Sequence, residues 1–326
     1  MKLATLNDGS RDGQLVVVSR DLTMAHYATG VADRMQQVLD DWNFLSPQLQ
    51  TLSDTLNHGH ARHAFAFDPA FCLAPLPRSY ALVLGQGYAQ SPADGRGEPA
   101  SKPCAGYAQL GFSDELLGPR AALCCASALQ CPDFAAAFAV ITGDVPQGAT
   151  PAQALDGVRL LMLANHLVLR QLSGLASIAA TAFSPVAVTP DELTLRDESV
   201  WASGKLALTL QCQVNGRKVA GLDAAHDMAV SMGAVIAQVC QTRRLRAGAI
   251  VSSGEVRQRD TTKGFASLNS LREFEGVQAG QATTPWLGQG DSVTLNMTGR
   301  DGKNVFGSID QDVQVGQAPL TSPPLV

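Results

Sequence analysis

The residues best suited to chemistry in this sequence lie in one stretch, from Asp133 to Arg170. Two apolar runs within it predict buried strands joined by a short helical crossover, and polar residues stand only at the strand ends. They are Asp144, Asn165, His166 and Arg170. An imidazole can exchange a proton near neutral pH, and a guanidinium can hold a carboxylate. Because strand interiors are rigid and strand ends face solvent, this arrangement favours a site.

The composition indicates a water-soluble globular protein. The chain has 326 residues, of which 45% are hydrophobic and 16% charged, enough for one large domain or two. A net charge of −5 without a long basic run argues against nucleic-acid or anionic-membrane partners. No apolar run approaches the ~20 residues of a membrane span, and the N-terminus is too polar for a signal peptide, so we expect a cytoplasmic protein. Seven unevenly spaced cysteines without a C-x-x-C pair favour reduced thiols over disulfides or structural zinc.

The pattern of the chain predicts two domains and a tail. A Gly- and Pro-rich segment at 85–107 has no hydrophobic period and predicts a long surface loop or lid. Strands predominate over helices throughout, which favours a β-rich α+β fold. The predicted parts are a small N-terminal domain over residues 1–72, a larger domain over 73–315 and a disordered tail over 316–326.

Several elements can be placed from local signals. Gln14 to Ser19 is a β-branched strand, and apolar residues from Val31 to Trp42 recur at helical spacing. Pro47 is expected to restart a second helix. Asn215-Gly216 is the strongest hairpin signal, and a second hairpin is expected to pair residues 292–298 with 303–309.

Two clusters of basic side chains allow more than one interpretation. The three histidines at a predicted helix end suit a solvated C-terminus better than a metal site, because their spacing is loose. The three arginines after a later helix likewise suit a solvated helix end better than an anion-binding patch. The clusters are His58, His60 and His63, and Arg243, Arg244 and Arg246.

Taken together, several segments resemble the fumarylacetoacetate hydrolase superfamily, in its bacterial form with a small N-terminal domain. The resemblance implies an α+β, β-rich fold with a mixed β-sheet/β-roll catalytic domain, usually as a homodimer. Such proteins act on small β-dicarbonyl acids and hold Mg²⁺ or Ca²⁺ with carboxylates from a Glu-x-Glu pair and a later Asp. The segments that carry the resemblance are Leu39 to Phe44, Ala74 to Arg78, Ala139 to Asp144, Leu160 to Leu163, Ala182 to Leu193, Asn215 to Lys218 and Gly299 to Gly302.

The sequence departs from this family at its chemical positions. Ala135 and Ala137 stand where the family has the two glutamates, and His166 stands where it has the aspartate. The family's lid histidine and active-site lysine fall on Ser91 and Ile178. Oxygen ligands for a hard cation are therefore missing, so we expect no Mg²⁺ or Ca²⁺ there and no cofactor. The alternative is a metal with rearranged ligands such as Asp133 or Asp144.

Other positions of the implied pocket keep or gain polar groups. Arg170, a usual substrate contact, remains, and the turn that binds a substrate carboxylate reads Ser253-Gly254-Glu255. Tyr107 is assigned to the same substrate-binding set. If the fold is kept, His166 and Glu255 should face the cavity near Arg170, where His166 could act as an acid or base. Apolar replacements at 135, 137 and 178 would widen the cavity for a bulkier ligand.

Three interpretations follow. The first is a metal-independent enzyme that acts on a small β-dicarbonyl or polyketide-like carbonyl compound by bond formation, cleavage or isomerisation. His166, possibly with Glu255, would supply acid and base. The second is a catalytically inactive homologue that binds a ligand or pairs with an active relative. The third is an ordinary C–C hydrolase whose metal ligands have moved.

Overall fold

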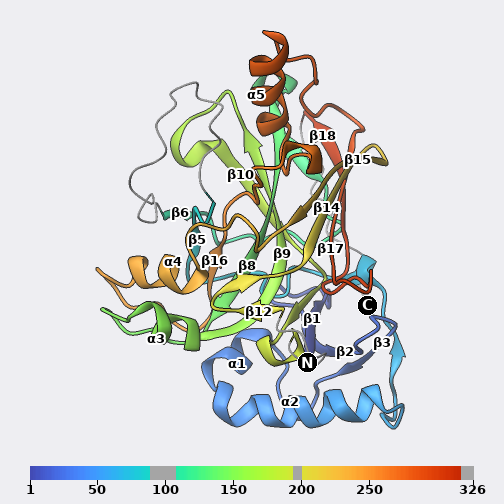
Figure 1. Ribbon diagram of the computed structural model, residues 1–326. Helices are drawn as coiled ribbons and strands as arrows, with labels where there is room; N and C mark the ends of the chain where they lie inside the picture. Colours follow the sequence, from blue (N-terminus) through green and yellow to red (C-terminus); the bar gives the residue numbers. More distant parts are fainter. Residues whose placement is uncertain (89–107, 194–199, 317–326) are drawn as a thin grey trace.

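The computed structural model describes residues 1–88, 108–193 and 200–316, and Figure 1 shows their arrangement. A mixed sheet of eleven strands runs through the molecule, and β1 pairs with both β2 and β11, so the N-terminal strands are part of it. In spatial order its strands are β4 (Phe65–Ala66), β3 (Met24–Tyr27), β2 (Gln14–Val18), β1 (Lys2–Leu6), β11 (Val186–Val188), β9 (Val158–Leu169), β8 (Pro132–Thr142), β16 (Ala249–Ser252), β5 (Leu82–Leu84) and β6 (Gln109–Gly111), with β10 (Ile178–Phe183) paired to β9.

The predicted α+β, β-rich architecture is confirmed. Most of the predicted loop at 85–107, including Ser91 and Tyr107, lies outside the described residues, as does the tail from 317. The six cysteines in the described part are free. No helix in that part is long and apolar enough to cross a membrane.

Two helices, α1 (Met35–Asp40) and α2 (Trp42–Asn57), run below the N-terminal strands in Figure 1. Their apolar residues Met35, Val38 and Leu49 are buried in the core on one side of the large sheet. The expectation that Pro47 begins the second helix was wrong. The break between the helices falls earlier, at Asp41, and Pro47 lies exposed inside α2. Proline has no N–H to bond the carbonyl one turn before it, and at an exposed position that carbonyl can be hydrated instead.

The predicted pair of buried strands is confirmed as β8 and β9, the longest strands of the protein's described part. They run antiparallel, and α3 (Pro151–Asp156) connects them as predicted. Thr150 caps this helix through a hydrogen bond to the Gln153 N–H, and Pro151 occupies its first position. Side chains of β8 alternate: Phe134 and Phe138 pack in the core on one face of the sheet, whereas Ala137 packs on the other.

The second sheet has five strands and shares the core that contains Phe138. The hairpin at Asn215-Gly216 is confirmed. The second predicted hairpin does turn after Thr298, which bridges to Asn304, but its long return strand is residues 309–315 and not 303–309. Gly307 takes a φ of +76° against Pro185, which turns the chain before the long pairing begins. The strands are β15 (Arg217–Asp223), β14 (Thr209–Val214), β17 (Ser292–Thr298), β18 (Ile309–Val315) and β7 (Leu123–Cys125).

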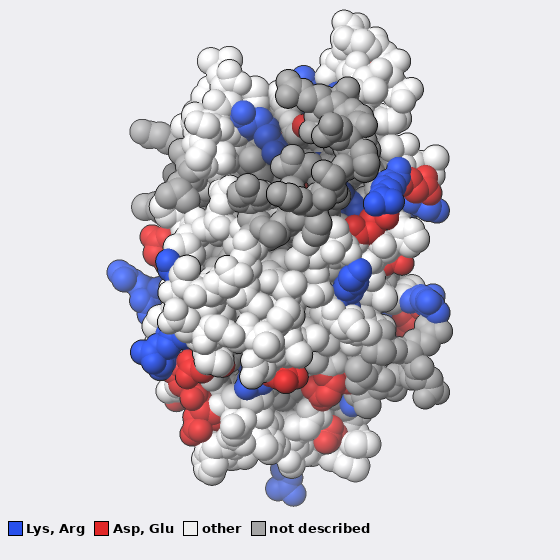
Figure 2. Space-filling view, turned by 60° about the vertical axis from the view of Figure 1, so that its left-hand side comes forward, with Lys and Arg blue, Asp and Glu red and all other residues white. Residues whose placement is uncertain are grey.

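The remaining elements lie at the sides and one end of the sheets. α4 (Met232–Val239) lies beside α3 and buries Val235 and Ile236, while α5 (Leu268–Ala279) projects at the end of the molecule opposite α2 (Figure 1). A two-stranded sheet joins β12 (Trp201–Ala202) to β13 (Lys205–Leu206). In the view of Figure 2, acidic and basic side chains are interspersed around a broad uncharged centre.

Candidate functional site

The register of β8 and β9 places the predicted site residues on one face of the large sheet. Ala135 lies opposite His166, and Asp133 lies opposite Val168. Since side chains alternate along a strand, Asp133, Ala135 and His166 share a face, and Arg170 joins them four residues beyond His166. His166 and Arg170, which directly follows the end of β9, are therefore separated by roughly 13 Å along the strand direction.

His166 is held at the centre of this face by two hydroxyl groups. Its Nδ1 lies 2.9 Å from Thr181 Oγ1 on β10, and its Nε2 lies 2.9 Å from Ser252 Oγ on β16. Ser252 lies beyond β8, opposite Ala139, so the small alanines of β8 leave room for the ring to reach it. The side chain bridges strands on both sides of β8.

The His166 bridge is uncharged at neutral pH. Only 4% of the residue is exposed, and burial lowers its pKa to about 4. A neutral imidazole has one donor and one acceptor nitrogen, so one of the two hydroxyls donates to the ring and the other accepts from it. Both ring nitrogens are thereby satisfied without a counter-charge.

Arg170 contributes to a different, charged cluster at the end of the β8–β9 pair. Its Nε and Nη2 donate to Asp133 Oδ2 at 2.9 and 2.7 Å. The Asp133 carboxylate also accepts the N–H groups of Leu268 and Asn269, at the start of α5. Burial raises the pKa of the Asp133 carboxyl, whereas the Arg170 guanidinium and the two N–H groups lower it. The positive end of the α5 dipole also favours this carboxylate.

Glu255 lies at the same helix N-terminus. Its Oε1 accepts hydrogen bonds from Ser267 Oγ at 2.8 Å and Ser270 Oγ at 2.5 Å, and its Oε2 lies 3.2 Å from Arg257 Nη2. Ser267 is the N-cap of α5 and bridges to Ala135 across the edge of β8. Glu255 and Arg170 thus both act on the start of α5, through Ser267 and Asp133.

The turn at Ser253-Gly254 connects β16 to Glu255. Ser253 Oγ accepts the Phe138 N–H and donates to the Gly254 carbonyl, so the hydroxyl is used inside the protein. Gly254 has a φ of +76°, and a Cβ there would lie 2.3 Å from the Gly85 carbonyl oxygen. Glycine is therefore required by both conformation and space.

The structure thus divides the predicted site residues into two groups. Arg170, through Asp133, and Glu255 both interact with groups at the start of α5. His166 bonds to two hydroxyl groups and to neither Arg170 nor Glu255. Sequence reasoning missed Thr181 and Ser252, and considered Asp133 only as a relocated metal ligand. Each missed hydroxyl is a lone polar group in an otherwise apolar strand, which is the signal that could have identified it.

The donor set does not fit the metal that the resemblance implies. Ala135 and Ala137 offer no ligand atom, and both nitrogens of His166 already have partners. The carboxylate of Asp133 is occupied by Arg170 and α5. Within the described ranges, no group of three or more His, Cys, Asp or Glu side chains is placed to hold a metal ion. Mg²⁺ and Ca²⁺ need several oxygen ligands, which these positions lack.

Comparison with protein families agrees with this architecture. The family model described as fumarylacetoacetase N-terminal domain 2 matches residues 1–78, and the model for the fumarylacetoacetate (FAA) hydrolase C-terminal domain matches residues 82–314. The fold and these matches define a protein in which a small N-terminal domain is followed along the chain by a hydrolase-type C-terminal domain. The chain belongs to the fumarylacetoacetate hydrolase family, as its sequence motifs predict.

Solved structures share the fold over nearly the whole chain. Maleylpyruvate hydrolase from Sphingobium sp. SYK-6 has a TM-score of 0.66 at 15% identity, covering 97% of this chain and 100% of that one. 2-Hydroxyhepta-2,4-diene-1,7-dioate isomerase from Mycobacterium marinum has a TM-score of 0.58 at 14% identity, covering 97% of this chain and 98% of that one. Fumarylacetoacetate hydrolase from Exiguobacterium antarcticum has a TM-score of 0.64 at 15% identity, covering 97% of this chain and 99% of that one. No curated protein matches the chain.

Proposed function

We propose that this chain is an enzyme that acts on a small dicarbonyl acid without a divalent metal at the family's usual position. The observation that carries the proposal is the neutral His166, bridged by Thr181 and Ser252 beside Ala135, where the family motif has carboxylates. Structurally similar proteins named as a maleylpyruvate hydrolase and a heptadienedioate isomerase support the substrate class. The reaction class is enolisation followed by C–C cleavage or isomerisation.

Arg170 and His166 have complementary roles in this proposal. Nε and Nη2 of Arg170 donate to Asp133, Nη1 makes no hydrogen bond with a described residue, and 24% of the side chain is exposed. That side of the guanidinium is suited to a substrate carboxylate. His166 would exchange a proton with the substrate through the Ser252 hydroxyl that touches its Nε2. Glu255, Ser253, Gly254 and α5 would shape the pocket, and Tyr107 remains assigned to substrate binding.

A second function is favoured by a specific observation. Both nitrogens of His166 are engaged, and a base whose pKa is about 4 is weak at neutral pH. These properties suit a catalytically silent homologue that binds an acid through Arg170. The family resemblance supports a homodimer in either case, and the sequence supports a cytoplasmic location.

The decisive experiment measures enolisation directly. Exchange of the C3 protons of pyruvate in D₂O, and cleavage of acylpyruvates of increasing acyl length, would be followed by NMR in excess EDTA and again with Mg²⁺ or Mn²⁺. We expect turnover in EDTA that the metals do not raise, and a loss of about 10²-fold in His166→Gln. His58→Gln, an exposed histidine at the end of α2, is the matched control and should retain full activity.

The other results identify the alternatives. Pyruvate binding by calorimetry without any exchange or cleavage would replace the first function with the silent homologue. Activity that requires a metal, together with a stoichiometric micromolar metal site, would establish relocated ligands and overturn the proposal.

A further inference from the structure

A small groove lies on the face of the large sheet opposite His166. In the parallel pair of β16 and β5, Ser252 lies opposite Leu84 and Val251 opposite Val83. Ser252 and Val83 therefore point to opposite faces. Val83 lines the groove together with Val239 at the end of α4. The groove has a volume of about 200 Å³, smaller than the ~300 Å³ lower range of pockets for drug-sized ligands.

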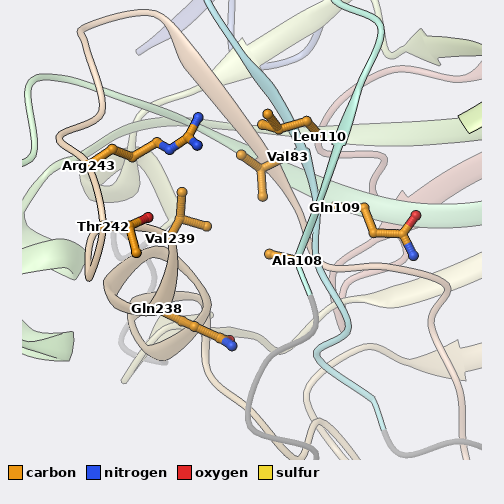
Figure 3. A pocket seen from close by; sticks show the side chains of 8 residues that line it. All are labelled: Val83, Ala108, Gln109, Leu110, Gln238, Val239, Thr242 and Arg243. Carbon is orange, nitrogen blue, oxygen red and sulfur yellow. The ribbon is translucent and has the colours of Figure 1, made fainter.

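The groove lies between the strands that carry Val83 and Leu110 and the segment that carries Val239, Thr242 and Arg243, as Figure 3 shows. Val83 and Leu110, from β5 and β6, form one wall, and Val239 at the end of α4 lies across from them. Thr242 and Arg243 follow α4, and in this view both side chains extend toward the strands. Such a combination of apolar walls and a few polar groups is typical of small-ligand sites.

The described lining residues of the groove carry positive charge only. None of its eight described lining residues is acidic, and Arg243 makes no hydrogen bond or ion pair with a described residue. Arg246, three residues further on, instead has Asp144 3.5 Å away. The helix C-terminus would disfavour an anion, but the Cys240 and Gln241 carbonyls already accept the Gly148 N–H and the Gln147 amide. The full charge of Arg243 therefore dominates.

We infer that this groove binds a short aliphatic carboxylate, with the carboxylate on Arg243 and the Thr242 hydroxyl and the alkyl chain between Val83, Leu110 and Val239. The volume corresponds to roughly seven groups of the size of a water molecule, which a five-carbon carboxylate matches. Guanidinium–carboxylate hydrogen bonds supply orientation, and the apolar walls select for a chain. This site is separate from the proposed enzymatic function and does not depend on it.

The test titrates sodium pentanoate, at constant ionic strength, into the full chain carrying ¹³C-labelled Val and Leu methyl groups. We expect the Val83, Leu110 and Val239 methyl signals to shift with a millimolar Kd. Arg243→Gln should weaken binding about tenfold, the loss of one charge-assisted interaction. Arg244→Gln makes the same change of charge on a neighbour that does not line the groove, and it should leave the Kd unchanged.

Two further ligands separate the contributions. Acetate keeps the charge without the chain, 1-pentanol keeps the chain without the charge, and both should bind more weakly than pentanoate. Thr242→Val provides a second variant with a smaller expected loss. The inference is overturned if these methyl signals do not shift at tens of millimolar pentanoate, or if Arg244→Gln weakens binding as much as Arg243→Gln. A shift that depends on Arg170 would instead assign the binding to the other face.

Discussion

The polar side chains on one face of β8 and β9 form two clusters, one around Asp133 and one around His166, and buried polar groups are stabilised differently in the two. At the outer end, the Asp133 carboxylate is buried with a guanidinium and a helix N-terminus around it. At the inner end, His166 is neutral and needs only two hydroxyl partners. The outer cluster is stable only while its charges remain matched, whereas the inner bridge contains no charge to match.

On the proposal that Ala135 and Ala137 replace the family's two glutamates, this difference explains how the fold could be kept without the metal. Closely spaced carboxylates in a sheet interior repel each other and require a cation. With alanine at 135 and 137, a neutral imidazole fits beside β8 without a counter-ion. The outer cluster cannot be simplified in this way, because Asp133 also accepts the first N–H groups of α5.

The largest expected effect comes from removing the outer carboxylate. Asp133→Ala leaves Arg170 without its partner and two N–H groups of α5 without an acceptor. We expect a loss of about 3 to 5 kcal/mol in the free energy of unfolding, because a buried charged network is broken from one side. Urea denaturation followed by fluorescence and circular dichroism would measure it.

A carboxylate near the other end of β8 provides the matched control. Asp144 pairs with Arg246 at 3.5 Å, but 63% of its side chain is exposed. Asp144→Ala should therefore change the free energy of unfolding by less than about 1 kcal/mol. Equal losses in the two variants would contradict the distinction between a buried charged cluster and a surface ion pair.

The next largest effect is a pH dependence of the free energy of unfolding, caused by His166 and its two hydroxyl partners. The pKa of His166 falls from 6.5 to about 4 on folding, so the unfolded chain binds its proton more tightly. Stability should therefore fall as the pH drops from 6.5 to 4, by about 3 kcal/mol in total from this group. Above pH 6.5 the group should contribute no slope.

His166→Gln isolates this contribution, since glutamine does not titrate. The difference in unfolding free energy between wild type and variant should shrink as the pH falls from 6.5 to 4, and it should be constant above that window. Denaturation series at each pH give the difference, in which other titrating groups cancel. A difference that is independent of pH would mean that His166 is not held neutral by burial.

Sequence patterns predicted the elements of this site better than its contacts. The apolar runs of β8 and β9 and the capped helix between them are local signals, and family motifs singled out His166 and Arg170 in the same stretch of the chain. Ser252 and Thr181 could not be paired with His166 in advance, because they come from strands 86 and 15 residues away. The role of Glu255 depends on Ser267, which a loop brings back to β8. Such pairings depend on sheet order, which periodicity does not encode.

The smallest expected effect distinguishes the two hydroxyls that hold His166. Thr181→Val replaces one hydroxyl with a methyl group and should cost about 1 kcal/mol of unfolding free energy. Ser252→Ala should cost somewhat more, because Ser252 Oγ also accepts the Gly254 N–H at 3.2 Å. Thr209→Val, on an exposed position of β14, is the control and should be close to neutral.

Ring ¹⁵N shifts of His166 would then show which hydroxyl donates. If Ser252 donates to Nε2, the wild-type ring carries its proton on Nδ1, and Thr181→Val leaves that N–H without an acceptor. The ring should then move its proton to Nε2 and donate to Ser252, which keeps one hydrogen bond and limits the loss of stability. If Thr181 is the donor, the same variant leaves the wild-type tautomer unchanged. A variant that loses stability without either tautomer dominating would show that the inner bridge is not a pair of specific hydrogen bonds.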